Sequence, residues 1–435
     1  MQEIVQQKLA DAVSFKLPPL TPREARVPAI PGKAHAVIGM RRAGKTWFLY
    51  QCMQERLSRG RPRESLVYFN LEDDRLAGIR SGQLAWILED YYRRFPDYRD
   101  AEPVTLLLDE IQVVPGWEAF VRRILDTENV EVFVSGSSAR LLSREVATSL
   151  RGRSTETVIF PYSFREFLIH HGQAVPADPD FVPKRQVSLL EGAFAQYLEV
   201  GGFPEAQGLE ERDRIGLLQG YVDSVILRDV VERHSITNVE ALRRLVRQLL
   251  GAAGGRFSVH RFYNDLRSQG LPVSKQTLHE LMAYLEDAFL FVTASLATTS
   301  ERRRQSNPRK IYPLDPGMVR AFDRSGKRNV GSRLETAVAL ELARRSSEWG
   351  YCTTASGQEV DFQARLHDGT ELLIQVCAGM SEEGTREREA GALEEALRDF
   401  PEACGLLLTL TNEDARLARV ERAETIPVWR WLLRS

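Results

Sequence analysis

The sequence predicts an α/β fold with a parallel sheet that is covered by helices on both faces, and three observations point to it. Apolar, β-favouring runs alternate with helical patterns between residues 34 and 160. The first run leads directly into a glycine-containing segment, Gly39–Thr46. A later run, residues 104–109, ends in two adjacent carboxylates, Asp109 and Glu110.

The expected helices and strands follow from the positions of turn-forming residues and from the spacing of apolar residues. A polar leader, residues 1–33, contains prolines at 18, 19, 28 and 31. Strands are expected at 34–38, 66–70, 104–109 and 130–135. Helices are expected from the glycine-containing segment to about residue 57, and at 83–92 and 117–125. Residues 34–160 therefore form the first predicted folded domain.

The segment Gly39–Thr46 reads GMRRAGKT, and its place between a strand and a helix is that of a phosphate-binding loop. Backbone N–H groups and the positive end of the helix dipole face a bound anion there, and glycines let the backbone approach it. Lys45 is expected to reach the terminal phosphates of ATP, and Thr46 to bind Mg²⁺. The residues expected at ATP are Gly39, Met40, Arg41, Arg42, Ala43, Gly44, Lys45, Thr46 and Trp47.

The two carboxylates after the apolar run 104–108 complete this predicted site. Asp109, at a strand end, is expected to hold Mg²⁺ together with Thr46. Glu110 is placed to orient the attacking water or to take its proton. The sequence therefore predicts an ATP hydrolase with ATP and Mg²⁺ as cofactors.

Composition favours a reduced, cytoplasmic protein of two or three domains. The chain has 435 residues, is 43% hydrophobic and carries a formal net charge of −2. Its four cysteines, at 52, 352, 377 and 404, have no metal-binding spacing. The chain begins with polar residues rather than a signal peptide, and no apolar run approaches the roughly 18 residues of a membrane span. No membrane contact is therefore predicted.

Residues 161–250 are expected to form a helical lid or connector, because apolar residues recur there at spacings of three and four. Gly201-Gly202-Phe203-Pro204 interrupts the helical pattern. That interruption is consistent with a hinge and equally with a simple turn.

Residues 251–330 carry 13 Lys and Arg against 7 Asp and Glu and resemble a winged helix. A helix at 259–266, a turn, and a second helix from Lys275 would be followed by wing-like strands at 289–292 and 310–314. Ser274 would cap the second helix. The expected DNA contacts are Lys275, Gln276 and His279 on that helix, and Arg302, Arg303 and Arg304 in a loop suited to phosphates. Winged helices also serve as protein-binding modules, which leaves that alternative open.

Eight segments resemble a bacterial or archaeal AAA+-type ATPase family whose C-terminal region is a domain of unknown function. They are Gly39–Thr46, Leu106–Gln112, Val134–Ser138, 150–153, 160–167, 200–204, Lys310–Gly317 and 359–362. The resemblance implies a homo-oligomeric ring, for which a hexamer is one arrangement. It also implies that Ser137 senses the γ-phosphate, unless Ser137 only caps a helix. Arg153, or less favourably Arg151, would reach the nucleotide of a neighbouring subunit as an arginine finger.

The last segment, residues 331–435, is acidic, with 12 Lys and Arg against 19 Asp and Glu. Its order of helix 335–342, a strand from Glu359 that ends at Asp361, and strand 372–376 resembles the PD-(D/E)XK nuclease fold. The corresponding metal site would contain Glu335, Asp361, Gln375 and Cys377, and it appears in a degenerate form. Gln375 is a weaker ligand, and Cys377 cannot supply the positive charge of the lysine in that motif. A nuclease-like domain without cleavage is therefore expected, with Cys377 as a small core residue.

The chain as a whole is thus expected to be a P-loop ATPase of the AAA+ type with a helical lid, a winged-helix region and a nuclease-like α/β domain. The predicted function is an oligomeric, DNA-associated motor or remodeller that hydrolyses ATP. An ATP-gated Mg²⁺-dependent nuclease is the first alternative, and it would need a lysine from elsewhere, such as Lys310 or Lys327. A nucleotide-switched signalling or scaffold ATPase that does not contact DNA is the second.

Overall fold

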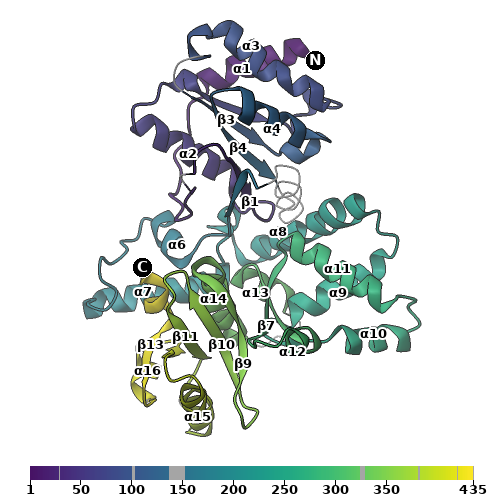
Figure 1. The fold of residues 1–435 in the computed structure, drawn as a ribbon. Helices are drawn as coiled ribbons and strands as arrows, with labels where there is room; N and C mark the ends of the chain where they lie inside the picture. Colours follow the sequence, from purple (N-terminus) through teal and green to yellow (C-terminus); the bar gives the residue numbers. More distant parts are fainter. Residues whose placement is uncertain are drawn as a thin grey trace. The chain divides into compact units, whose positions relative to one another are not determined.

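The computed structural model describes residues 1–28, 30–99, 103–136, 152–323, 329–380, 383–418 and 420–434. It forms two compact units. The first contains Met1–Phe160 and Asp287–Phe289, and the second contains Pro161–Glu286 and Leu290–Ser435. Each unit has its own sheet (Figure 1).

The first unit is a five-stranded parallel sheet in the order β2-β3-β4-β1-β5. The predicted strands are confirmed to within a residue, and β4 lies between β1 and β3. The bounds are α1 Gln2–Ser14, β1 Ala34–Ile38, α2 Lys45–Ser58, β2 Leu66–Asn70, α3 Ala85–Arg94, β3 Val104–Asp109, α4 Trp117–Thr127, β4 Val130–Gly136 and β5 Ser154–Val158. Short 3₁₀ turns occur at Arg63–Ser65, Asp74–Leu76, Ser81–Leu84, Pro96–Tyr98 and Ile111–Val113.

The N-terminal leader contains a helix that belongs to this unit. Val5, Leu9 and Ala12 of α1 are buried, and Val5 and Leu9 join the apolar core of the five-stranded sheet. Their spacing of three and four places them on one helical face. The leader is therefore, in part, a core element.

Arg23 anchors the rest of the leader to the glycine-containing loop. Its buried guanidinium donates to the carbonyl oxygen of Ala43 at 3.0 Å and to that of Phe160. The backbone of Arg23 also pairs in both directions with the Gln51 side chain of α2, at 2.7 and 3.1 Å. The leader thus braces the loop at Ala43.

The second unit is an eight-stranded mixed sheet in the order β13-β12-β11-β10-β9-β7-β8-β6, surrounded by helices (Figure 1). Its first part is helical, as predicted for 161–250. The bounds there are α6 Phe164–His170, α7 Lys184–Val200, the 3₁₀ turn Pro204–Ala206, α8 Glu211–Ser224, the π-helix η7 Val225–Glu232 and α9 Val239–Gly251. The later elements are β6 Arg256–Phe257, α10 Val259–Ser268, α11 Lys275–Asp287, β7 Phe291–Leu296, α12 Glu301–Ser306, β8 Arg309–Pro313, α13 Pro316–Phe322, α14 Val330–Arg345, β9 Ser346–Thr353, β10 Glu359–Leu366, β11 Glu371–Cys377, α15 Glu383–Asp399, β12 Cys404–Thr409, α16 Asn412–Leu417, β13 Ala423–Pro427 and α17 Val428–Leu433.

Strand β7 joins the segments predicted as a winged helix and as a nuclease-like domain. It pairs antiparallel with β8 and parallel with β9 through Ser295 and Leu296. The two expected wing strands are therefore part of one continuous sheet with the C-terminal strands. Asp361 also differs from expectation: β10 continues five residues past it, so Asp361 lies inside the strand.

The predicted arginine loop at 301–310 is a short helix for its first six residues. The Ser300 hydroxyl accepts from the backbone N–H of Arg303 at 3.4 Å and caps α12. Glu301 in the first turn and the arginines in the last turn suit the helix dipole. These local signals favour a helical turn over a loop.

Gly201 and Gly202, considered above as a hinge, are packed tightly in this unit. A Cβ on Gly201 would lie 1.8 Å from Oδ1 of Asp315, and one on Gly202 would lie 2.3 Å from the carbonyl oxygen of Tyr162. Asp315 is buried and accepts from the backbone N–H groups of Gly202 at 2.5 Å and Gly317 at 2.8 Å. Close approach is therefore the reason for glycine at both positions.

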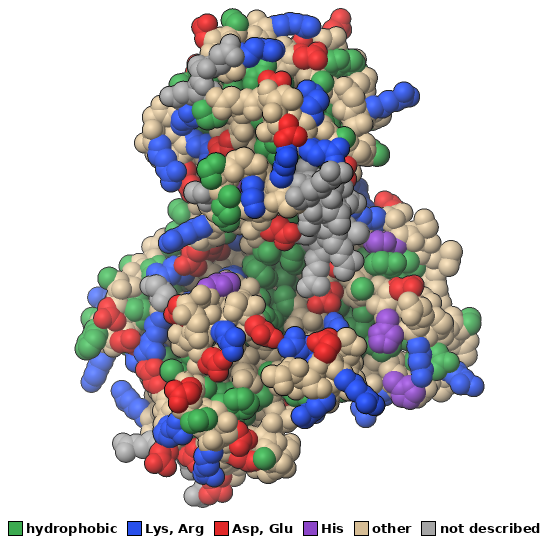
Figure 2. Space-filling view, in the orientation of Figure 1, with side chains coloured by type: hydrophobic (Ala, Val, Ile, Leu, Met, Phe, Trp, Pro, Cys, Tyr) green, Lys and Arg blue, Asp and Glu red, His purple; other side chains and the backbone are tan. Residues whose placement is uncertain are grey.

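Charge is distributed in small areas of either sign. On the face seen in Figure 2, Lys and Arg side chains alternate with Asp and Glu side chains, in keeping with the net charge of −2. Within the described ranges, no helix has both the length and the apolar character needed to cross a bilayer.

Candidate nucleotide-binding site

The glycine-containing loop joins β1 to α2 in a conformation that depends on its glycines. Gly39 has φ +147°, and a Cβ there would lie 2.3 Å from the carbonyl oxygen of Ile159. Arg42 and Gly44 also have positive φ, at 67° and 105°. The chain therefore turns sharply before α2, and the first turn of α2, whose N–H groups have no partner within the helix, follows the loop directly.

Lys45, the first residue of α2, is buried and held inside the loop. Its Nζ lies 3.2 Å from the carbonyl oxygens of Gly39 and Met40, and 3.9 Å from Oε1 of Glu110. These contacts fix the ammonium group beside the loop, where it can neutralise a bound phosphate.

Asp109 ends β3 and is surrounded by hydroxyl groups. Thr46 Oγ1 donates to its Oδ2 at 2.8 Å, and Tyr68 OH donates to the same oxygen at 2.7 Å. Ser135 Oγ donates to Oδ1. The structure thus brings together Thr46 and Asp109, the two residues predicted to bind Mg²⁺.

Tyr68 and Ser135 belong to this site although the sequence analysis did not name them. Tyr68 lies on β2 and Ser135 on β4, and these strands flank β3 in the parallel sheet. Ser135 follows an apolar run just as Asp109 does, which is a signal that was available in the sequence. Burial and the charge of Asp109 raise the pKa of Tyr68, so its hydroxyl remains a donor.

Glu110 follows Asp109 in the left-handed region, with φ 54°. Its backbone N–H donates to Ser135 Oγ at 3.1 Å, and Gln112 Nε2 donates to its Oε2 at 2.5 Å. A non-glycine residue in this conformation is strained, and such strain clusters at functional sites. The carboxylate is therefore held close to both Lys45 and Asp109.

Several of the other residues predicted at ATP are more exposed than Lys45 and Asp109 or lie outside the described residues. Arg41 forms an ion pair with Glu72 at 3.5 Å, and the Trp47 ring is 46% exposed, with its centroid 6.0 Å from that of Tyr50. Arg153 is about half exposed and forms an ion pair with Asp126. Ser137 and Arg151 lie outside the described residues.

Taken together, the donors fit a magnesium nucleotide. Thr46 and Asp109 offer hard oxygen atoms of the kind that Mg²⁺ prefers. The loop N–H groups, the α2 N-terminus and Lys45 offer positive charge to phosphates. Glu110 adds a second carboxylate beside Lys45.

The residues predicted to contact DNA lie on α11 and α12. Ser274 Oγ accepts from the backbone N–H of Thr277 at 2.9 Å, so the predicted cap of α11 is confirmed. Lys275, Gln276 and His279 are exposed; Lys275 lies over the ring of Tyr263 at 5.2 Å. On α12, Arg302 and Arg303 are exposed, and Arg304 forms an ion pair with Glu348 at 2.9 Å. No hydrogen bond or ion pair in the described ranges joins the α11 group to the α12 group.

A charged cluster surrounds Lys310 in the second unit. The buried Nζ lies 2.9 Å from Glu335, 2.7 Å from Glu359 and 3.0 Å from Asp361. Burial lowers the pKa of Lys310, but the three carboxylates outweigh it and the net pKa is raised. Burial and the charge of Asp361 raise the pKa of Glu335 to about 7. The structure thus places Lys310 between the two carboxylates predicted at the degenerate site.

The remaining residues of that predicted site are close by but differ in role. Gln375 donates from Nε2 to Asp361 at 3.0 Å and to Glu389 at 2.5 Å. Cys377 is buried in an apolar cluster and donates from Sγ to the carbonyl oxygen of Gly379 at 3.1 Å. Burial raises the pKa of the Cys377 thiol, in agreement with the predicted core role. Lys327 lies outside the described residues.

Comparison with family models identifies two regions. Residues 31–168 match an AAA domain, and residues 191–329 match a domain of unknown function, DUF8612. The AAA match contains the whole glycine-containing loop, Asp109, Glu110 and Ser135.

Two relatives match over most of their length. The uncharacterised protein MJ1544 of Methanocaldococcus jannaschii is 32% identical over 94% of this chain and 90% of its own. An uncharacterised protein of Haemophilus influenzae is 30% identical over 81% and 84%. Among solved structures, the Walker-type ATPase of Pyrococcus abyssi aligns with a TM-score of 0.40 at 15% identity, over 74% of this chain and 95% of that chain.

Proposed function

The chain belongs to the protein family of MJ1544 from Methanocaldococcus jannaschii and carries an AAA domain, and we propose that it hydrolyses ATP as an oligomeric, DNA-associated motor or remodeller. Nucleotide binding follows from the AAA domain. Hydrolysis, assembly and DNA association are the proposed steps beyond it.

One observation carries the proposed hydrolysis: three hydroxyls converge on Asp109 beside Lys45 and Glu110. Bound Mg²⁺ would polarise the phosphoryl oxygens. Thr46 and Asp109 would hold the metal, and Lys45 would neutralise the terminal phosphates. Glu110 would orient the attacking water and accept its proton, since its strained backbone and Gln112 fix its carboxylate.

The proposed assembly is a homo-oligomeric ring, with a hexamer as one arrangement. Arg153 supports it, because among the residues that the structure describes its half-exposed guanidinium is bound only through an exposed pair with Asp126. Exposed pairs contribute at most about 1 kcal/mol, so Arg153 can exchange Asp126 for a phosphate of a neighbouring subunit at small cost. Arg151 remains the alternative finger.

The proposed DNA contacts are Lys275, Gln276 and His279 at the exposed start of α11, with Arg302, Arg303 and Arg304 on α12. The start of a capped helix is where recognition helices meet base edges. The arginines are suited to phosphates, whose binding depends strongly on salt.

The test is the ATPase rate with and without single-stranded, duplex and four-way-junction DNA. We expect stimulation by at least one of these DNAs. A rate that none of them changes would contradict DNA association and favour the nucleotide-switched scaffold. A variant with Lys275→Glu and His279→Glu should lose the stimulation and keep the basal rate.

The Lys310 cluster supports the second candidate, an ATP-gated nuclease. The order α14, β9, β10, β11, α15, β12 supports the proposal of a nuclease-like fold, with β9 and β10 antiparallel, β10 and β11 antiparallel, and β11 and β12 parallel. Lys310 supplies the positive charge that Cys377 cannot. It also pairs with three carboxylates at once, which favours a closed structural cluster without cleavage as the first choice.

Cleavage separates the two candidates. A plasmid and the DNAs above are incubated with Mg²⁺ and ATP and run on a gel. We expect intact DNA with wild type. Cleavage that Asp361→Asn abolishes, while ATPase activity persists, would establish the nuclease and overturn the structural role of the cluster.

A further inference from the structure

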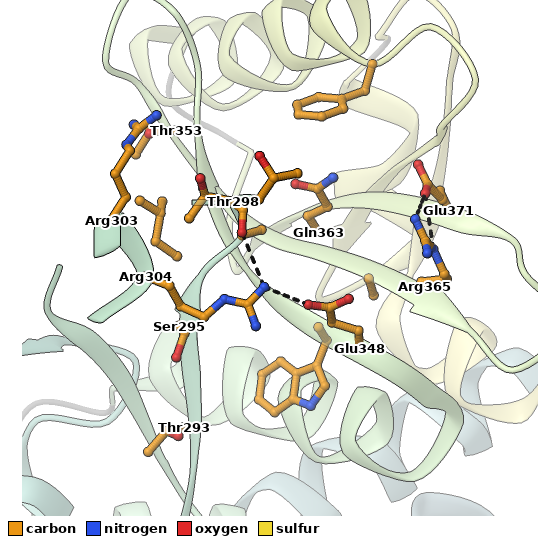
Figure 3. A pocket seen from close by; sticks show the side chains of 16 residues that line it. Thr293, Ser295, Thr298, Arg303, Arg304, Glu348, Thr353, Gln363, Arg365 and Glu371 are labelled. Carbon is orange, nitrogen blue, oxygen red and sulfur yellow. Dashed lines mark hydrogen bonds and ion pairs between the residues drawn. The ribbon is translucent and has the colours of Figure 1, made fainter. Parts of the chain in front are cut away.

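An open cavity of about 520 Å³ lies on the eight-stranded sheet of the second unit. Strands β7, β9 and β10 line it, together with α12 and with Phe400, which follows α15. Arg303 and Arg304 stand on one side of it, and Arg365 with Glu371 on the other (Figure 3). All of these residues belong to one unit, and none belongs to the nucleotide site.

Polar side chains line a large part of the cavity. The hydroxyl and amide side chains are Thr293, Ser295, Thr298, Thr299, Thr353 and Gln363. Such groups both donate and accept hydrogen bonds. The lining also contains apolar side chains, Leu296, Ala297, Trp349, Ala364 and Phe400. The surface therefore suits a ligand that combines polar atoms with flat apolar faces, as the sugars and bases of nucleic acid do.

Charge in the cavity is positive by one unit. Arg304 is neutralised by Glu348 at 2.9 Å, and Arg365 by Glu371 at 2.5 Å. Arg303 is exposed, and in the described part of the chain its guanidinium has no ion pair and no hydrogen bond. It is thus the lining cation that is left for an anionic group of a ligand.

Phe400 supplies an aromatic surface beside these charges. Its side chain is 37% exposed at the end of α15. Exposed aromatic side chains next to a basic surface are the platform on which the bases of single strands stack. A duplex keeps its bases stacked inside and cannot use such a platform.

We propose that this cavity binds a single strand of nucleic acid, with a backbone phosphate on Arg303 and a base against Phe400. The hydroxyl and amide groups between them would bind sugar and base edges without demanding one sequence. This inference rests on the DNA association proposed above. It adds a site for an unpaired strand that is distinct from the α11 contacts.

The chain offers a matched control in Arg185 on α7. It belongs to the same unit, is exposed like Arg303 and has the same charge, but it neither lines the cavity nor belongs to the proposed DNA contacts. Arg303→Glu and Arg185→Glu therefore change net charge identically. In the described part of the chain neither guanidinium has an ion pair or hydrogen bond, so neither substitution removes a native contact.

Fluorescence anisotropy of a labelled oligothymidylate of about 16 nucleotides measures the affinity over a range of salt concentrations. Arg303→Glu should weaken binding roughly tenfold and lower the salt slope by about one unit. Phe400→Ala should weaken it about fivefold or more. Arg185→Glu should stay within about twofold of wild type.

Three outcomes would overturn the site. Equal losses in Arg303→Glu and Arg185→Glu would mean that Arg303 acts only through the net charge of the protein. Displacement of the strand by AMP or inorganic phosphate at similar concentrations would identify a small phosphorylated ligand instead. If wild type does not bind the oligothymidylate but its ATPase activity is still stimulated by DNA, the cavity is not a single-strand site. The proposed function would not be affected by that result.

Discussion

Tyr68 and Asp109 share a hydrogen bond of 2.7 Å that joins two neighbouring strands of the ATPase unit at the predicted magnesium site. The Tyr68 hydroxyl and the Thr46 hydroxyl donate to the same oxygen of Asp109. Tyr68 thus fixes the direction of a carboxylate that is expected to hold Mg²⁺. Loss of a group that positions a metal ligand typically lowers metal affinity or activity by about 10- to 100-fold.

Tyr68→Phe should therefore raise the Mg²⁺ concentration needed for half-maximal ATPase activity by about tenfold. Only the hydroxyl is removed, so the fold should persist. Titration of ATPase activity with Mg²⁺ measures the effect. Tyr91→Phe is the control, because its hydroxyl donates to the carbonyl oxygen of Glu64 elsewhere in the same unit. An unchanged Mg²⁺ requirement in Tyr68→Phe would refute the positioning role.

Arg153→Ala should abolish hydrolysis while each subunit still binds ATP, because the proposed finger acts on the nucleotide of a neighbour. Arginine fingers contribute roughly 10³-fold or more to the rate. Asp126→Ala is the matched control, since it removes only the partner of Arg153. ATPase assays and binding of a fluorescent ATP analogue separate the two steps. Normal hydrolysis in Arg153→Ala would contradict the assignment of Arg153 as the arginine finger and leave Arg151 as the remaining candidate.

Asp315 should make the second unit less stable as pH rises from about 4 toward 7. Burial raises its pKa to about 7 from the usual 3.8, although Gly202, Gly317 and Met318 donate to it and lower the pKa. The folded state then binds a proton that the unfolded state has released. Stability is complete below the unfolded pKa and falls by up to about 1.4 kcal/mol per pH unit through this window.

Denaturant unfolding of wild type and Asp315→Asn across that window tests the sign. The stability of wild type relative to the variant should fall with rising pH. A difference that is flat, or that grows in favour of wild type, would mean that Asp315 is ionised and held by its backbone donors.

Gly201→Ala should destabilise the second unit by several kcal/mol, because the new Cβ would meet Asp315 and the backbone there has φ 80°. Gly192→Ala on α7 is the control, since open space surrounds that position and a helix favours alanine. Thermal unfolding measures both. Normal stability in Gly201→Ala would support a flexible hinge instead of a packed corner.

Much of the ATPase unit could be predicted because its signals are local. The runs at 34–38, 66–70 and 104–109 are short, apolar and bounded by turns, and they became β1, β2 and β3. Thr46 belongs to the glycine-containing loop and Asp109 ends an apolar run, and these two patterns together predict that the residues lie at one site. The role of Tyr68 could not be predicted, because no residue near it in the sequence indicates that its side chain points toward Asp109 on the neighbouring strand.

The second unit was harder to predict because its key contacts are distant in sequence. Lys310 meets Asp361 across 51 positions, and Asp315 meets Gly202 across 113. The parallel pairing of β7 with β9 is likewise not indicated by any local sequence pattern. Helix caps, by contrast, are local signals. The cap at Ser274 was predicted, whereas the cap at Ser300, which begins the helix containing Arg302, Arg303 and Arg304, was not.

The most direct measurement compares ATP binding and single-turnover ATP hydrolysis in wild type, Glu110→Gln and Lys45→Ala. We predict that Glu110→Gln binds ATP as wild type does but loses hydrolysis by about 10²-fold or more, since it retains the hydrogen-bonding shape and removes the base. Lys45→Ala should lose binding. Hydrolysis at the wild-type rate in Glu110→Gln would contradict the assignment of Glu110, and with it the proposed ATPase site.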